Sequence, residues 1–97
     1  MAGGDRIARR YVVSGLVQGV GFRWTAQRVA RSLSITGTVR NLPEGTVEIE
    51  AHGGPEALEG LREALRTRMP GRVDAVLEDH LESPGQGGTP DDFRVVF

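Results

Sequence analysis

The sequence of 97 residues contains no cysteine and no lysine. The absence of cysteine excludes disulfide bonds, thiolate nucleophiles and cysteine-ligated metal sites. All twelve cationic side chains are arginine, which excludes Schiff-base chemistry and the lysine of a Walker-type phosphate loop. No run of about 20 apolar residues is present, and the first residues lack an apolar segment of signal-peptide length. We therefore expect a cytoplasmic protein with no membrane partner.

The net charge and the length of the chain further restrict the class of protein and its expected partners. The formal net charge is −1, so no long-range electrostatic field favours nucleic acid as a partner, and any basic site must be local. The length suits one domain, residues 1–97, with residues 1–6 as a disordered N-terminal tail. Nothing in the composition indicates self-association, so a monomer is the default expectation.

Hydrophobic periodicity predicts seven elements along the chain. Residues 22–32 carry apolar side chains at helical spacing, and a second helix runs from Pro55 until a Met-Pro-Gly stop at residues 69–71. A loop rich in glycine and proline is expected at residues 82–91. The predicted strands are residues 7–14, 36–41, 46–52 and 72–81 and a short last strand at residues 93–97.

This order predicts an α+β fold of the ferredoxin-like β-α-β-β-α-β type, with a short fifth strand at the C-terminus. The expected sheet is antiparallel, with both helices on one face. In the strand at residues 46–52, apolar side chains alternate with Glu48, Glu50 and His52, which predicts a half-buried strand with His52 on its polar face. Because this fold supports many functions, the function must be argued from a site.

Residues 15–23 join the first strand to the first helix and contain three glycines. Gly15, Gly19 and Gly21 allow backbone conformations that point successive amides into one concavity. The helix that follows adds unpaired N–H groups and the positive end of its dipole. Arg23 adds a planar fork suited to two phosphoryl oxygens. The pattern indicates an anion site, although glycine spacing alone is equally compatible with an ordinary turn beside a solvated arginine.

Two motifs resemble those of the acylphosphatase family. Residues 15–23 read Gly-Leu-Val-Gln-Gly-Val-Gly-Phe-Arg, where the family has Gly-x-Val-Gln-Gly-Val-x-Phe-Arg. A second motif, Val-Arg-Asn before a turn that ends Gly-x-Val, is matched by residues 39–41 and 45–47. The resemblance covers about residue 10 to residue 97. It implies an enzyme that hydrolyses the carboxyl–phosphate bond of small acyl phosphates without a cofactor or metal ion, and that takes inorganic phosphate or sulfate as a site ligand.

The resemblance also implies roles for single residues. Arg23 is similar to the family's phosphate-binding arginine and Asn41 to its water-positioning asparagine, so these two are the predicted catalytic residues. Asn41 precedes a turn, and on its own it would be interpreted as a turn residue. The predicted substrate-binding residues, which contribute backbone amides and the Arg23 side chain, are Val17, Gln18, Gly19, Val20, Gly21, Phe22 and Arg23.

Three positions depart from the family pattern. Thr38 stands where tryptophan is common, and we expect it to weaken packing beneath the hairpin that carries Asn41. Ala26 stands where threonine is frequent. Ser34 stands where a helix-ending glycine is usual, which we expect to make the helix exit less favourable by up to ~1 kcal/mol.

Other interpretations remain open from the sequence. His52 and His80 are single and well separated, which favours surface residues over metal ligands. Phe22 and Trp24 are predicted to pack in the core, and an RNA-binding sheet would need aromatics and a basic excess that the chain lacks. The alternative function is a non-catalytic anion-binding or regulatory module, since acylphosphatase-like domains also occur within larger maturation proteins. The end of the sequence directly after its last strand favours a free-standing enzyme.

Overall fold

The computed structural model describes residues 6–81 and 91–97. The predicted order of elements, and with it the ferredoxin-like fold, is confirmed. Residues 1–5 of the predicted tail and residues 82–90 of the predicted loop lie outside the described residues. The elements are β1 (Ile7–Leu16), α1 (Phe22–Ser32), β2 (Thr36–Asn41), β3 (Val47–Gly53), α2 (Pro55–Thr67), β4 (Arg72–Leu81) and β5 (Phe93–Val96).

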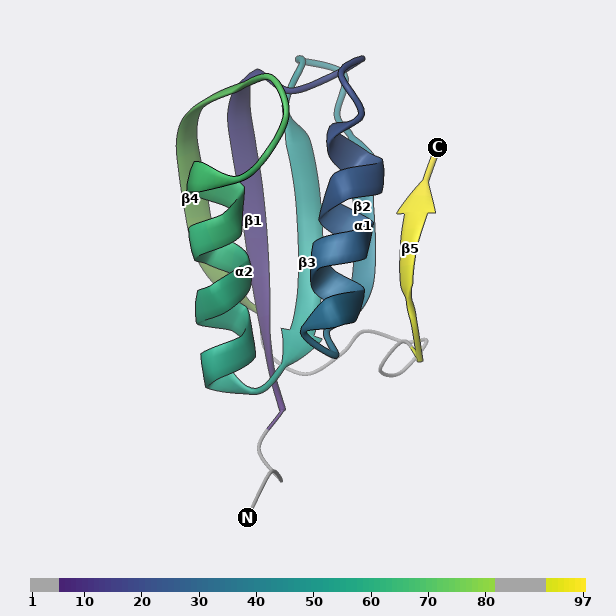
Figure 1. The fold of residues 1–97 in the computed structure, drawn as a ribbon, viewed down its shortest axis with the longest axis vertical. Helices are drawn as coiled ribbons and strands as arrows, with labels where there is room; N and C mark the ends of the chain where they lie inside the picture. Colours follow the sequence, from purple (N-terminus) through teal and green to yellow (C-terminus); the bar gives the residue numbers. More distant parts are fainter. Residues whose placement is uncertain (1–5, 82–90) are drawn as a thin grey trace.

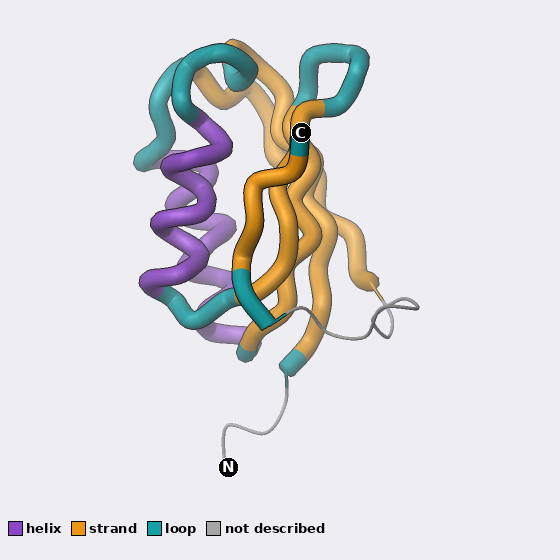
Figure 2. The backbone as a smooth tube through the Cα atoms, turned by 90° about the vertical axis from the view of Figure 1, so that its right-hand side faces the viewer, coloured by secondary structure: helices purple, strands orange, loops and turns teal. Residues whose placement is uncertain are grey.

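The five strands form one sheet in the order β4-β1-β3-β2-β5, and both helices cover the same face (Figures 1 and 2). The first four strands pair antiparallel, but β5 pairs parallel with β2, so the sheet is mixed rather than antiparallel throughout. The reason is geometric. β2 and β4 run in opposite directions, so β2 begins at the end of the sheet where β4 finishes. Because β5 follows β4 and starts at this same end, it runs in the same direction as β2.

The core lies between the sheet and the two helices. Ala26 and Ala30 of α1 are fully buried and their small side chains let the helix approach the sheet, whereas α2 contributes leucines. The hydroxyl of Tyr11 is buried and donates a hydrogen bond to the carbonyl oxygen of Leu58, 3.3 Å away. Burial raises the pKa of Tyr11 to about 12. The largest fully buried side chains are Tyr11, Phe22, Phe93, Ile35, Ile49, Leu61 and Leu65.

The other sheet face carries charged side chains that bury one another. Glu48, expected on a solvated face, is only 5% exposed, because Arg10 and Arg40 donate hydrogen bonds of 2.7 and 2.8 Å to its two carboxylate oxygens. Burial alone would raise the pKa of Glu48, but these two hydrogen bonds outweigh it and the pKa is lowered. Glu48 therefore fastens β1 to β3 and β2 on the face that has no helix.

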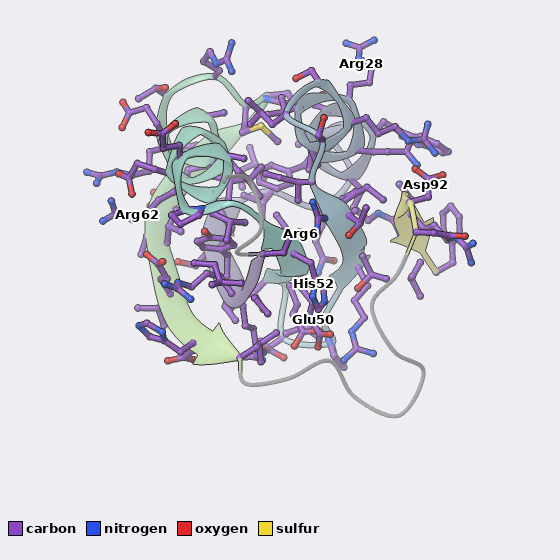
Figure 3. The ribbon with its side chains drawn as sticks, turned by 90° about the horizontal axis from the view of Figure 1, so that it is seen from below. Arg6, Arg28, Glu50, His52, Arg62 and Asp92 are labelled. Carbon is purple, nitrogen blue, oxygen red and sulfur yellow. The ribbon has the colours of Figure 1, made fainter. Side chains whose placement is uncertain are left out.

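His52 also differs from its expected surface position. It is 8% exposed, and burial lowers the pKa of its imidazole. Arg6 lies beside it (Figure 3) and donates hydrogen bonds to the carbonyl oxygen of His52 and to the hydroxyl of Thr36. The expectation of a surface histidine was therefore wrong, and Arg6, which the sequence placed in a tail, is bound to β3 and to the start of β2 at this position.

Thr38 lies on the open face as well, opposite Glu50 of β3 and beside Arg94 of β5. Successive strand residues point to opposite faces, so Val39 faces the helices and Thr38 does not. The absence of a tryptophan at Thr38 therefore affects the open face. The expectation that it weakens packing beneath the hairpin is not supported, because the helix-facing side of β2 is filled by Val39.

Helix α1 ends in a Schellman motif. The N–H of Ile35 donates to the carbonyl oxygen of Ala30 at 2.9 Å, and the N–H of Ser34 donates to that of Arg31 at 3.1 Å. Ser34 consequently has φ of 60°, and it is the one residue other than glycine with a positive φ in the described part of the chain. A side chain at this left-handed position costs free energy that glycine would not.

We expect the substitution Ser34→Gly to raise the free energy of unfolding by about 1 kcal/mol, measured by urea denaturation. The matched control is Ser32→Gly, two residues earlier at the last residue of the helix, which should lower it by about 0.5 kcal/mol. Two changes of the same sign would contradict the assignment of strain to Ser34.

Candidate active site

The loop between β1 and α1 is anchored by apolar side chains that point into the core. Val17 and Phe22 are each 1% exposed, and Val20 packs partly buried against the same core. Between these anchors, Gly19 and Gly21 have φ of 77° and 84°, and a side chain added at either would meet no atom within 4 Å. The conformation of the loop requires glycine at both positions, and the space above them is open.

Helix α1 begins immediately after this loop with an uncapped N-terminus. Gly21 is its N-cap and makes no side-chain hydrogen bond to the first turn, and the first turn contains no acidic residue. The first N–H groups of a helix have no partner within the helix, and they carry the positive end of its dipole. Helix α2 differs, because it begins with Pro55 and has Glu56 in its first turn. The start of α1 is therefore the more electropositive of the two.

Asn41 is the last residue of β2 and faces the side of the sheet that the helices cover. The buried Val39 points to this side, and Asn41 follows it by two residues. The β1–α1 loop and the β2–β3 turn lie at the same end of the molecule, at the top of Figure 1. The Oδ1 atom of Asn41 is buried and accepts no hydrogen bond from any described residue. A buried acceptor without a donor costs about 1–3 kcal/mol, which makes it a place where a ligand or water is expected to bind.

The β1–α1 loop, the first turn of α1 and the end of β2 line a pocket of about 120 Å³ that is open to solvent. One wall is Asn41 at the end of β2, and the other is the glycine loop with the first turn of α1. The pocket is lined by Val17, Gly19, Gly21, Phe22, Arg23, Trp24 and Asn41.

Arg23 is held at the pocket by β5. Its Nη1 atom donates to the carbonyl oxygen of Val96 at 3.2 Å, and its guanidinium carbon lies 4.6 Å from the centre of the Phe97 ring. Among the described residues, no carboxylate lies within 4 Å of this half-buried guanidinium. The remaining N–H groups of Arg23 are available for an anion.

Two further side chains of α1 hold the helix beside β5, and they follow Arg23 at intervals of four residues. Gln27 donates to the carbonyl oxygen of Phe93 at 3.0 Å, and Arg31 makes a two-pronged contact with Asp92 at 3.1 and 2.9 Å. Residues four apart lie on one face of a helix, so Arg23, Gln27 and Arg31 form a continuous stripe toward β5. Arg28 lies off this stripe and points away from the molecule (Figure 3).

The side-chain amide of Gln18 joins the two walls of the pocket. Its Nε2 atom donates to the carbonyl oxygens of Leu42 and Thr46, both at 2.9 Å. The same two residues close the β2–β3 turn through backbone bonds, in which Leu42 N–H donates to Thr46 and Gly45 N–H donates to Leu42. Gln18 therefore fixes the turn that carries Asn41 relative to the loop that leads to Arg23.

The comparisons with known proteins agree with this arrangement. The acylphosphatase family model matches residues 9–95. An acylphosphatase of Nitratidesulfovibrio vulgaris is 47% identical over 90 residues, covering 92% of this chain and 89% of its own length.

The chain belongs to the acylphosphatase family.

Solved structures show the same relationship in three dimensions. The crystal structure of an acylphosphatase from Bacillus subtilis superposes with a TM-score of 0.85 at 33% identity, covering 94% of this chain and 99% of that one. The structure of T. kodakarensis HypF gives a TM-score of 0.81 at 31% identity, but the match covers 94% of this chain and only 12% of HypF. The same fold is therefore found both as a whole small protein and as a segment of a much larger one.

The structure places most of the predicted site residues of this acylphosphatase-family chain around one pocket. Gln18 and Val20 are the exceptions among the side chains, because Gln18 points to the β2–β3 turn and Val20 packs on the core. Phe22 packs in the core as expected, but Trp24 is 57% exposed and lines the pocket, so its expected core position was wrong. No local sequence pattern indicates the contacts of Val96 and Phe97 with Arg23, because these contacts depend on the parallel pairing of β5.

Two structural features are absent from residues 6–81 and 91–97. No helix there is both long and apolar enough to cross a membrane. No group of three or more histidine or carboxylate side chains there is arranged to hold a metal ion.

We expect Gln18→Ala to lower the free energy of unfolding by about 1–3 kcal/mol, because two hydrogen bonds are lost and two carbonyl oxygens are left without that donor. Hydrogen exchange of the Leu42 and Gly45 amides should become faster, which NMR can measure residue by residue. Gln27→Ala is the control: it removes one comparable bond to Phe93 and should leave exchange at Leu42 and Gly45 unchanged. Unchanged exchange at both amides in Gln18→Ala would show that Gln18 does not hold the turn.

Proposed function

We propose that the chain hydrolyses acyl phosphates to a carboxylate and inorganic phosphate, without a metal ion. The observation that carries this proposal is the convergence of three groups on one small pocket. These are the uncapped start of α1, the guanidinium of Arg23, which has no carboxylate partner among the described residues, and the Oδ1 of Asn41, which has no donor among them. The first two attract a phosphoryl group, and the third is an acceptor for a water proton. Membership of the acylphosphatase family supports the same reaction.

The binding step follows from charge and geometry. The backbone amides of residues 17–23 and the start of α1 surround the phosphoryl oxygens, and Arg23 contributes two parallel N–H groups. Phosphoryl transfer needs positioning and charge stabilisation more than covalent help. Fixed amides and a guanidinium that point at the developing charge can supply both.

The chemical step requires one oriented water molecule. Asn41 Oδ1 accepts a hydrogen bond from this water. The bond orients the water so that a lone pair of the water oxygen points at phosphorus. The new oxygen–phosphorus bond forms while the bond between phosphorus and the acyl oxygen breaks, and the electron pair of that bond leaves with the carboxylate. The water proton passes to a phosphoryl oxygen of the substrate. Since a carboxylate is already a good leaving group, no strong general acid is needed.

The test is turnover of benzoyl phosphate in the presence of a chelating agent. We expect hydrolysis to continue, and we expect Arg23→Lys to lose most of it despite the unchanged charge, because a single ammonium cannot form the two-pronged contact. Arg28→Lys, on the solvent side of the same helix, is the matched control and should retain full activity. Activity that disappears with chelator and returns with Mg²⁺ would exclude the metal-independent mechanism.

Asn41→Ala should lower kcat by on the order of 10²-fold, by analogy with the removal of a comparable positioned hydrogen-bonding group. The affinity for inorganic phosphate, measured by calorimetry, should change little, because the anion is held by the loop and by Arg23. An unchanged kcat would make Asn41 a turn residue and remove it from the mechanism.

One observation favours a second candidate, a non-catalytic anion-binding or regulatory module. The similarity to a segment that forms 12% of T. kodakarensis HypF shows that the fold also occurs inside a larger protein. The same two measurements decide between the candidates. Phosphate binding that depends on Arg23, without turnover of any acyl phosphate, would favour the module over the enzyme.

A further inference from the structure

Trp24 is the feature of the pocket that phosphate binding leaves unused. It is the one tryptophan of the sequence, and it stands in the first turn of α1 directly after Arg23. Its side chain is 57% exposed although it lines the pocket. Tryptophan is highly buried on average, so an indole that remains exposed beside an anion site requires an explanation.

The size of the pocket indicates what the indole could contact. Pockets that enclose whole drug-sized ligands measure ~300–1,000 Å³. At about 120 Å³, this open pocket is well below that range and suits the phosphoryl group better than a whole acyl phosphate. The acyl group therefore lies against the rim, where Trp24 offers a large apolar surface.

The direction of attack places the acyl group on the side away from Asn41. Attacking and leaving oxygens lie roughly in line through phosphorus, so the leaving carboxylate points away from the attacking water. Asn41, at the end of β2, occupies the wall from which the water comes. Trp24 lines the same pocket from the first turn of α1, a different element from the strand end that carries Asn41.

We infer that Trp24 binds the acyl group of the substrate and gives the site a preference for acyl phosphates with an aromatic or extended apolar acyl group. This inference rests on the proposed function and names its substrate class. A flat acyl group can stack on the indole and cover it from water. A small one such as acetyl reaches little of it, and a charged one would lose hydration without gaining a partner there.

The first experiment compares kcat/KM for benzoyl phosphate and acetyl phosphate in the wild type and in Trp24→Ala. We expect the variant to lose about 10-fold for benzoyl phosphate and to change little for acetyl phosphate, a discrimination of the size that apolar contacts provide. Trp24→Phe should restore most of the preference. Leu77→Ala removes an apolar side chain that is 66% exposed on β4 and should affect neither substrate. An equal loss for both substrates, or no loss for either, would overturn the inference.

A binding experiment separates this inference from the proposed function. In 2-oxo-2-phenylethylphosphonate and 2-oxopropylphosphonate, a CH₂ group replaces the bridging oxygen, so neither compound can be hydrolysed at that bond. Calorimetry should show tighter binding of the phenyl compound to the wild type, with the difference absent in Trp24→Ala. Trp24 fluorescence should respond more strongly to the phenyl compound. Equal affinities together with turnover of acetyl phosphate would refute the acyl preference alone. Unequal affinities without turnover of either acyl phosphate would refute the hydrolase and leave the apolar subsite.

Discussion

Two hydrogen bonds from the side chain of Gln18 hold together the parts from which the pocket is built. The glycine loop and the β2–β3 turn are far apart in sequence, and each is exposed at the same end of the sheet. A primary amide has two N–H donors, so one Gln18 can satisfy the carbonyl oxygens of both Leu42 and Thr46. These carbonyls lie just beyond the strand end that carries Asn41. The relative position of the cationic wall and the Asn41 wall therefore depends on a residue that need not touch the substrate.

The strand β5 provides the second constraint, because it determines where Arg23 can point. Seven of the twelve arginines form ion pairs with carboxylates of the described residues, such as Arg40 with Glu48 and Arg31 with Asp92. Arg23 is held instead by a carbonyl oxygen and an aromatic ring, neither of which cancels its charge. Gln27 and Arg31 fasten the same helix face to β5. The result is a cation whose position is fixed while its charge stays available to an anion, the condition that preorganised binding requires.

The sequence predicted the elements and the loop well because both depend on local patterns. Helical and strand periodicities identified the order of elements. Gly19 and Gly21 adopt a left-handed φ, and glycine is the residue type that predicts such a conformation. The errors concern positions decided by distant neighbours. His52 is buried on a central strand where Arg6 also binds its carbonyl oxygen, and Glu48 is buried because two arginines from adjacent strands converge on it. The parallel direction of β5 follows from the path of the whole sheet, which no local pattern encodes.

Two side chains break the usual rules of burial, and both line the same pocket. Asn41 has a buried acceptor that finds no donor in the described part of the chain, and Trp24 exposes a large apolar ring. Each arrangement is unfavourable in the free protein, and local departures of this kind are expected where function outweighs stability. The two departures also complement each other, since one lacks a polar partner and the other an apolar one. A ligand with a polar head and an apolar body would satisfy both at once, whereas inorganic phosphate alone would leave the indole exposed. The proposed substrate, a phosphoryl group joined to an acyl group, therefore matches the pocket better than the free anion does.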